Sequence, residues 1–272
     1  MNLRDHFQRV KYALGKRMKL GQRSYVVKGY FASNFILNDT QHEQHLLILL
    51  RRHLPNIDGV FIDVGANLGQ TLVKVLTVDA TRPYFGFEPL LPCCDELQRF
   101  IHINNLSHMR VVPIGLSNEN NLVKFYSHGL YDDTASLLGH GGGLETIVQV
   151  RVGDDLFDEL EIEKIGFIKV DVEGAEWQVF DGLRRTLKRD KPMLAFEVLP
   201  NFVGPARVSV SKSEAKANWE RLDRLQLVLS DSGYRLNRVH PDGGEEPIEK
   251  IDLDDKDGYI SNDFTATALS NP

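Results

Sequence analysis

Four apolar runs that each end at an acidic residue constrain the fold of this chain more than any other feature. The runs occupy 60–63, 84–88, 165–171 and 193–197. Apolar residues on both faces of a strand suit a parallel sheet that is covered by helices. Stretches with helical spacing separate the runs, and such alternation is typical of a doubly wound sheet. The sequence therefore predicts an α/β fold with a mostly parallel sheet and helices on both faces.

The remaining elements fit around these four strands. Helical spacing predicts helices at 41–54, directly after Gly69, and at 93–104, 175–187 and 213–229. Further strands are expected at 110–116, 122–126, 147–152, 234–239 and 264–269. Pro113 makes the first of these irregular, because proline has no N–H to donate to a sheet. The glycine-rich stretch 132–143 is expected to be a loop that could close over a reaction site.

Length and charge favour a single domain that does not bind nucleic acid. With 272 residues, we expect one domain over 41–272, preceded by a basic extension over 1–40. The net charge of -6 disfavours a nucleic-acid binder. Residues 1–28 are basic and 242–257 are acidic, and both runs are expected to be solvated surface. The basic run could instead contact an anionic surface such as lipid headgroups or a phosphorylated partner.

The sequence predicts a cytoplasmic protein. It has no run of about 20 apolar residues that could span a bilayer, and its N-terminus lacks the apolar core of a signal peptide. The two cysteines, Cys93 and Cys94, are adjacent in the sequence, so a disulfide between them would be strained. We expect both thiols to be reduced residues of a helix.

The acids that end the four strands are Asp63, Glu88, Asp171 and Glu197. Carboxyl ends of parallel strands meet at one edge of a sheet, which is where ligands of open α/β folds bind. Glu88 follows the glycine turn by about 20 residues, where an acid accepts hydrogen bonds from a ribose. Each acid alone would most often be a turn or helix cap. Together they predict a nucleoside-containing cofactor at this edge.

The glycine turn separates two kinds of cofactor. A dinucleotide site needs three closely spaced glycines, G-x-G-x-x-G, whereas this chain has Gly65-Ala66-Asn67-Leu68-Gly69 with Asp63 before it. An aspartate at that place would repel a pyrophosphate but suits a cationic ligand such as S-adenosylmethionine. A nicotinamide-dependent oxidoreductase is therefore disfavoured.

Several motifs together resemble the FkbM family of S-adenosylmethionine-dependent methyltransferases. They are Asp63-Val64-Gly65-Ala66-Asn67-Leu68-Gly69, Phe87-Glu88-Pro89, Ala135-Ser136-Leu137, Val150-Arg151-Val152 with Asp154-Asp155-Leu156, Ile168-Lys169-Val170-Asp171-Val172-Glu173-Gly174-Ala175-Glu176, and Pro192 with Phe196-Glu197-Val198. The resemblance covers about 58–200. It implies a class I methyltransferase sheet, which is Rossmann-like, and methylation of a hydroxyl of a sugar, glycolipid or secondary metabolite. A catalytically silent domain that binds a partner is an open alternative.

The resemblance also suggests roles for individual residues. The cofactor contacts would come from Asp63, Gly65, Asn67, Gly69 and Glu88. Ser117 and Asn118 would meet the adenine. Ser136 and Glu197 are expected to contact the acceptor, which would be a small molecule or a glycan.

Asp171 and Glu173 are the candidate catalytic residues. Both follow the strand at 165–171, where they would face the methyl group, and Asp171 could act as the base or position the acceptor hydroxyl. Glu176 is expected to stabilise the start of the following helix. A divalent metal could be held by Asp171, Glu173 and Glu197, but no histidine is spaced to help them. We therefore predict no metal site, although a metal stays open as an alternative.

Overall fold

The structure is a computed structural model of the 272-residue chain, and it describes residues 15–29, 43–127, 144–198, 212–252 and 262–269. For 212–218 only the backbone is described. Ser136, the loop 132–143 and the basic residues before Gly15 lie outside the described residues. No helix within the described ranges is long and apolar enough to cross a membrane.

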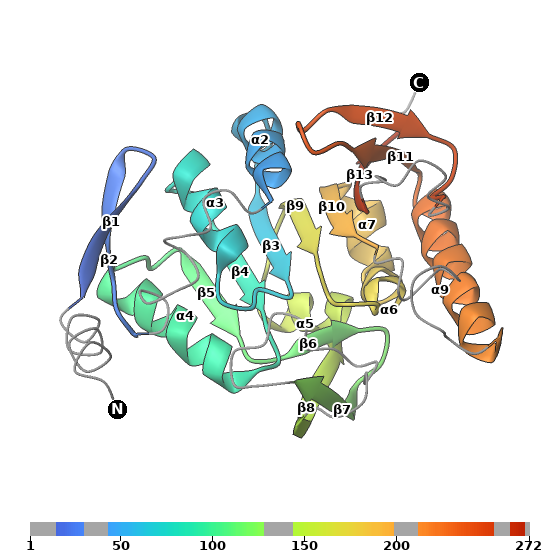
Figure 1. The fold of residues 1–272 in the computed structure, drawn as a ribbon, viewed down its shortest axis with the longest axis horizontal. Coiled ribbons are helices and arrows are strands. Elements are labelled where there is room, and N and C mark those ends of the chain that lie inside the picture. Colours follow the sequence, from blue (N-terminus) through green and yellow to red (C-terminus); the bar gives the residue numbers. More distant parts are fainter. Residues whose placement is uncertain (1–14, 30–42, 128–143, 199–211, 253–261, 270–272) are drawn as a thin grey trace.

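A central sheet of eight strands organises the molecule (Figure 1). In spatial order its strands are β12 (Glu245–Ile248), β11 (Tyr234–Val239), β13 (Asp263–Ala268), β10 (Met193–Glu197), β9 (Ile165–Val170), β3 (Val60–Val64), β4 (Tyr84–Phe87) and β5 (Met109–Val112). The strands from β10 to β5 pair in parallel, whereas β13 pairs antiparallel with both β10 and β11. The predicted mostly parallel sheet is confirmed.

Helices cover both faces of this sheet, because side chains of its inner strands alternate between two apolar clusters. On β3, Phe61 belongs to one cluster and Ile62 to the other. The first cluster includes residues of α2 (Gln44–His53), α3 (Gln70–Val78) and α4 (Leu91–Ile103). The second includes residues of α5 (Gly153–Glu159), α6 (Glu176–Asp181), α7 (Arg184–Asp190) and α9 (Lys212–Asp231). Two separate cores thus fix the sheet between two layers of helices.

The predicted helix over 175–187 is two helices, α6 and α7. The chain turns at Gly182, where a Cβ atom would lie 1.9 Å from the backbone oxygen of Ser117. Asp154 of α5 caps the start of α7. Its carboxylate accepts hydrogen bonds from the backbone N–H of Arg185 and Thr186 at 2.7 and 2.9 Å. The segment 175–187 is therefore divided for two reasons: the backbone at Gly182 packs against another part of the chain, and an acid of another helix caps α7.

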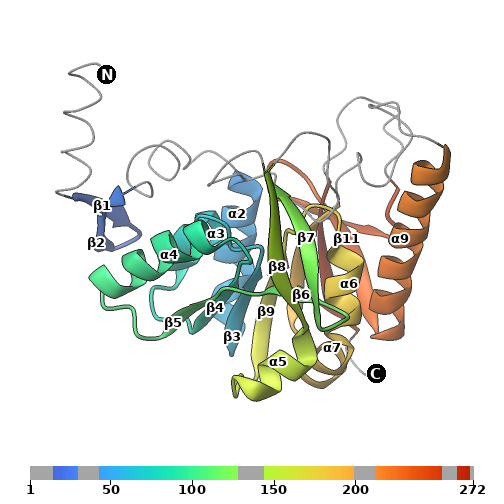
Figure 2. The same cartoon turned by 90° about the horizontal axis from the view of Figure 1, so that it is seen from below.

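A second sheet stands beside the carboxyl ends of the central strands. Its order is β6 (Gly115–Ser117), β8 (Leu144–Val152) and β7 (Asn121–Ser127). Figure 2 shows β7 and β8 in front of the central sheet. The predicted strand over 110–116 breaks at Pro113, so that β5 stays in the central sheet and β6 joins the second one. The irregularity expected at Pro113 is confirmed.

Both ends of the chain contribute elements that the sequence did not predict. β1 (Lys16–Leu20) and β2 (Arg23–Val27) form an antiparallel hairpin whose apolar residues join the cluster of α3 and α4. β12 lies within the acidic run 242–257. Glu245 of this strand contacts His53 at 2.7 Å and Arg52 at 3.0 Å, so the expectation of solvated surface was wrong for this residue. The hairpin and α9 lie at opposite ends of the molecule in Figures 1 and 2.

Candidate functional site

A cavity of about 430 Å³ opens at the carboxyl ends of the parallel strands. Three of the four strand-ending acids line it, namely Glu88, Asp171 and Glu197. The fourth, Asp63, lies at the end of β3 but is not among the lining residues. The acids that the sequence predicted at one edge of the sheet therefore surround a cavity, except for Asp63, which does not line it.

The glycine turn after β3 takes a shape that only small residues permit. Gly65 has a φ of 83°, and a Cβ atom there would lie 1.8 Å from the backbone oxygen of Asp171. Gly69 has a φ of 90° and begins α3. Asn67 is also left-handed, with a φ of 42°, a conformation that asparagine tolerates better than most residues. Gly65 thus brings β3 against the loop after β9, and Gly65 and Asn67 both line the cavity.

Glu88 is held by the backbone on two sides. One carboxylate oxygen accepts a hydrogen bond from the N–H of Asn67 at 2.9 Å, and the other accepts one from the N–H of Leu90 at 2.8 Å. Burial raises the pKa of Glu88 to about 7, although these two hydrogen bonds act in the opposite direction. Each carboxylate oxygen can accept more than one hydrogen bond. Glu88 is therefore fixed in place and can still accept hydrogen bonds from a ligand.

Asp63 is fully buried. The hydroxyl of Tyr84 donates to its Oδ2 at 2.5 Å, and its Oδ1 has no hydrogen-bond partner among the described residues. Burial raises the pKa of Asp63 to about 6, while the positive charge of Lys169 lowers it. Lys169 is also its neighbour across the β3–β9 pair. Asp63 therefore lies next to Lys169 and is not part of the cavity wall.

Lys169 and Asp171 form a close pair within the wall of the cavity. The Nζ of Lys169 lies 2.6 Å from the Oδ2 of Asp171. Burial alone would lower the pKa of Lys169, but the charges of Asp171, Glu43 and Asp63 raise it above its usual value. The lysine is therefore a fixed positive charge beside the candidate catalytic aspartate. Lys169 belongs to the motif at 168–176, but the motif did not predict a role for it.

Glu173 lines the cavity, whereas Glu176 does not. Glu173 lines the cavity from a left-handed position with a φ of 53°. Glu176 is buried and does not line it, and its carboxylate accepts a hydrogen bond from the N–H of Gly174 at 2.9 Å. Glu176 thus braces the loop that leads into α6, in agreement with the structural role expected for it.

Glu197 faces other negative charges. Burial, followed by the charges of Asp171 and Asp263, raises the pKa of Glu197 to about 9. The residue ends β10 and lines the cavity beside Lys169. A carboxyl in this setting holds its proton at neutral pH.

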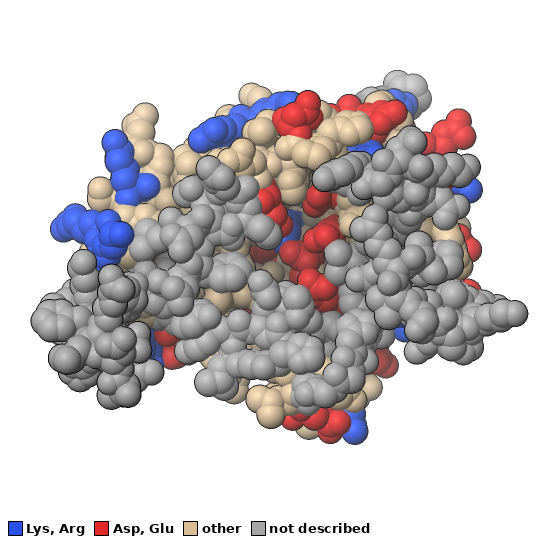
Figure 3. All heavy atoms as spheres, in the orientation of Figure 1, with Lys and Arg blue, Asp and Glu red and all other residues tan. Residues whose placement is uncertain are grey.

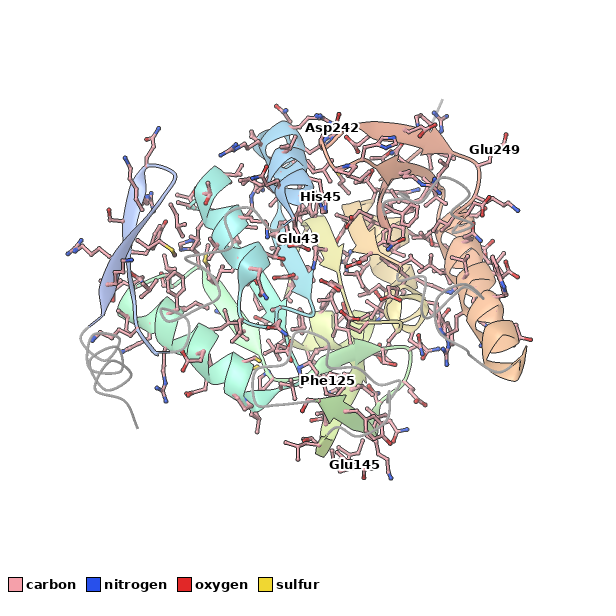
Figure 4. The ribbon with its side chains drawn as sticks, viewed as in Figure 1. Glu43, His45, Phe125, Glu145, Asp242 and Glu249 are labelled. Atoms are coloured by element: carbon pink, nitrogen blue, oxygen red, sulfur yellow. The ribbon has the colours of Figure 1, made fainter. Side chains whose placement is uncertain are left out.

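The polar lining residues that were not predicted include Glu43, His45 and Asp263. His45 Nε2 lies 3.1 Å from an oxygen of Asp263, and Glu43 lies 2.8 Å from Nζ of Lys74. Figure 4 shows Glu43 and His45 at the start of α2, with Phe125 of β7 far below them in that view. These residues come from elements remote in the sequence, and no local motif marks them.

The second sheet supplies part of the apolar lining, namely Leu116, Phe125, Val148 and Val150. The apolar lining residues include Phe87, Leu90, Leu116, Phe125, Val148 and Val150. Ser117 and Asn118 are not among the lining residues, although Gly115 and Leu116 are. Ser117 is buried, and the side chain of Asn118 donates to Asp181 at 2.9 Å. The cavity thus has one apolar end beside Phe125 and one charged end beside Lys169.

Among the residues that the structure describes, no group of three histidine, cysteine, aspartate or glutamate side chains is arranged to hold a metal ion. Asp171 is instead paired with Lys169.

Comparison with known proteins identifies the family. The family model described as methyltransferase FkbM domain matches residues 63–236. Hexuronic acid methyltransferase AglP of Haloferax volcanii is 27% identical over 188 residues, which cover 68% of this chain and 73% of that protein. Methyltransferase sdnD of Sordaria araneosa is 26% identical, and the match covers 48% of this chain and 62% of that protein.

Among solved structures, methyltransferase FkbM from Methylobacillus flagellatus is similar with a TM-score of 0.44 and 20% identity. The match covers 77% of this chain but only 43% of that chain. The sheet described above, with helices on both faces, is the class I methyltransferase sheet expected of the family whose model matches. The chain therefore belongs to the family defined by the methyltransferase FkbM domain, and it is a methyltransferase.

Proposed function

We propose that this methyltransferase uses S-adenosylmethionine to methylate a hydroxyl group of a sugar, glycolipid or secondary metabolite. One observation carries the proposal: Glu88, the proposed ribose contact, and Asp171, the proposed base, line the same cavity. The family membership supports methyl transfer. The relative named as a hexuronic acid methyltransferase supports a sugar acceptor.

The residues of the cavity fit this cofactor from end to end. Phe125 and Leu116 offer an apolar slot for adenine, and Glu88 offers oxygens to the ribose hydroxyls. The turn at Gly65 and Asn67 lies against the methionine part. Because Ser117 and Asn118 are outside the lining, we assign the adenine contact to Gly115 and Leu116 in their place. Asp63 would serve the cofactor indirectly, through the charge of Lys169.

When bound, S-adenosylmethionine supplies a methyl group on a positively charged sulfur. The methyl carbon would bond to the acceptor oxygen, and the electron pair of the broken carbon–sulfur bond would stay with sulfur. Asp171 takes the proton that the acceptor hydroxyl loses. Lys169 holds one oxygen of Asp171 at 2.6 Å, which leaves the other oxygen to receive the proton. Alignment of donor and acceptor supplies much of the acceleration in such a displacement.

Glu173, Glu197 and Ser136 have supporting roles in this proposal. Glu173 and Glu197 line the cavity next to Asp171, where they can contact the acceptor. Protonated Glu197 can donate a hydrogen bond to an acceptor oxygen. Ser136, which lies outside the described residues, remains a proposed acceptor contact.

The test is methyl transfer from isotope-labelled S-adenosylmethionine to a panel of glycosides and glycolipids, with the product analysed by mass spectrometry. We expect a methyl ether. Asp171→Asn should slow transfer by about 100-fold or more while S-adenosylhomocysteine affinity stays within about twofold. Asp242→Asn is the matched control, because Asp242 is exposed at the outer edge of the molecule (Figure 4). A methyl ester or methylamine product, or full activity of Asp171→Asn, would contradict the proposal.

A further inference from the structure

The hairpin of β1 and β2 is attached to the rest of the molecule by one face. The apolar side chains of this face, Met18, Leu20, Tyr25 and Val27, are buried and belong to the cluster that includes residues of α3 and α4. The ring of Tyr25 lies 6.0 Å from the ring of Phe100 of α4. Burial of this face leaves the opposite face of the hairpin pointing away from the molecule.

Asn104, which follows α4, fixes the backbone of the hairpin in place. Its side-chain oxygen accepts a hydrogen bond from the N–H of Val26 at 2.6 Å, and its side-chain nitrogen donates to the carbonyl oxygen of Val26 at 2.8 Å. The hairpin is therefore held both by apolar packing and by a pair of hydrogen bonds. Its outer face has a fixed orientation relative to the rest of the fold.

This outer face is basic. Successive side chains of a strand point to opposite faces, so Arg17 and Lys19 of β1 lie on the face that is not buried. The exposed cations of the hairpin and its flanks are Lys16, Arg17, Lys19, Arg23 and Lys28. Figure 3 shows Lys and Arg side chains over the hairpin and, apart from them, a hollow with Asp and Glu side chains near the middle of the molecule. The hairpin can therefore touch another surface without covering this hollow.

The positive charge of the hairpin is not offset nearby. Residues 15–29 contain no aspartate or glutamate, and none of the five cations forms an ion pair with another described residue. On the contacting helices, Asp95 of α4 and Asp79 after α3 each pair with an arginine, at 2.7 and 3.0 Å, and Glu96 of α4 is buried. In the part of the chain that the structure describes, this end of the molecule is therefore positive, although the whole chain carries a net charge of -6.

The arrangement of the cations differs from that of a site for a single anion. Arg17 and Lys19 are two residues apart on one strand, which separates them by about 7 Å along an open face. None of the five cations lines the cavity of the candidate functional site. A site for one phosphate instead gathers its donors around a common point. The hairpin therefore suits an extended anionic surface.

A lipid bilayer fits this surface better than a nucleic acid does. Single-stranded nucleic acids stack their bases on aromatic side chains, whereas Tyr25, the one aromatic residue of β1 and β2, is buried. Recognition of a duplex needs a basic surface over the whole domain, which the net charge of -6 disfavours. Groups of four to eight lysines and arginines are typical of proteins that bind anionic lipids.

We infer that the outer face of the β1–β2 hairpin docks this methyltransferase onto an anionic lipid bilayer. Each lysine or arginine near such a surface strengthens binding by roughly fivefold, and salt weakens the attraction. The residues before Gly15 extend the basic run in the sequence with Arg4, Arg9 and Lys11 against Asp5. The inference goes beyond the proposed function and does not depend on it, because the hairpin cations are separate from the cavity.

Co-sedimentation of the full chain with lipid vesicles tests the inference. Vesicles of phosphatidylcholine with about one third phosphatidylglycerol should bind the protein at least about tenfold more tightly than vesicles of phosphatidylcholine alone. Raising the NaCl concentration from about 0.05 to about 0.5 M should weaken this binding by at least about tenfold. Equal binding to the two kinds of vesicle would overturn the inference without the use of any variant.

Substitutions on the outer face locate the contact. Arg17→Gln combined with Lys19→Gln should weaken binding to the anionic vesicles by at least about tenfold, since two of the five cations are lost. The matched control combines Lys188→Gln with Lys250→Gln, which removes the same charge from exposed positions on α7 and after β12. It should bind within about twofold of the wild type, and both variants should keep the wild-type midpoint of urea denaturation.

Three further results would overturn the inference. One is an equal loss of binding in the control, which would show that net charge alone matters. Another is displacement of the vesicles by inorganic phosphate at an ionic strength where NaCl has no effect, which would show a site for a single anion. The third is tighter binding to a duplex RNA oligonucleotide than to the anionic vesicles. In each case the proposed function would still stand.

Discussion

Glu88 and Glu197 show how the surroundings of a carboxyl group determine which hydrogen bonds it can make. Both end strands of the central sheet and line the same cavity. Burial raises the pKa of Glu88 to about 7. The two backbone hydrogen bonds that Glu88 accepts offset part of this effect of burial on its pKa. Glu197 faces the charges of Asp171 and Asp263 in addition to its burial, and its pKa is raised to about 9. Glu88 is thus suited to accept hydrogen bonds, and Glu197 to donate one.

The pKa of Glu197 predicts how stability depends on pH. In the unfolded chain the carboxyl ionises near 4.5, and in the folded protein near 9. A carboxyl whose pKa is higher when folded stabilises the fold fully below its unfolded pKa and loses that contribution as the pH rises through its folded pKa. Glutamine does not ionise, so Glu197→Gln should be more stable than the wild type by roughly 3–5 kcal/mol at about pH 8 and by less than about 1 kcal/mol at about pH 5.

Urea denaturation at the two pH values measures this difference, in protein free of cofactor. Glu249→Gln serves as the control, because Glu249 is exposed and lies outside the cavity (Figure 4). Its stability relative to the wild type should not change between the two pH values. A Glu197→Gln difference that is equal at both would show that Glu197 ionises normally in the folded protein.

The glycine turn is the element that joins β3 to the catalytic loop after β9. Gly65 combines a left-handed φ with the close approach to the backbone oxygen of Asp171. Gly233 has a similar φ of 78°, but a Cβ atom there would meet only Nζ of Lys191 at 3.4 Å. The two glycines therefore separate the cost of an unfavourable φ from the cost of a backbone clash.

Gly65→Ala should lower the free energy of unfolding by about 3 kcal/mol or more, because the added methyl forces β3 and the Asp171 loop apart. Gly233→Ala should lower it by about 1 kcal/mol, the usual cost of a left-handed alanine. Thermal or urea denaturation of both variants measures the difference. Equal losses in the two variants would mean that the turn at Gly65 relaxes around the new side chain.

At the scale of the whole molecule, the sequence predicted those strands and strand ends that are marked by a local pattern of residues. The apolar runs predicted the strands β3, β4, β9 and β10, because burial on both faces leaves an unbroken apolar signature. The acids at the ends of these strands followed from the shared direction of parallel strands. Pro113 correctly marked the break between β5 and β6.

The features that were missed depend on long-range contacts. Glu43, His45 and Asp263 reach the cavity from α2 and β13, which adjoin the site only after the sheet has formed. The segment of β12 has the pattern of a charged surface run, and the contacts of Glu245 with α2 and Thr265 are not marked in it. Asp63 matched the motif, but its position behind Lys169 depends on how β3 and β9 align. Local sequence contains none of this information.

Calorimetric titration with S-adenosylhomocysteine tests the central claim most directly, namely that the cavity over β3, β4 and β9 binds the methyl donor. The wild type should bind with a single site and should not bind NAD. Glu88→Gln should weaken binding by at least about tenfold, because one acceptor oxygen is lost at the ribose position, while Glu249→Gln should not change it. Absence of binding, preference for NAD, or full affinity of Glu88→Gln would contradict the account.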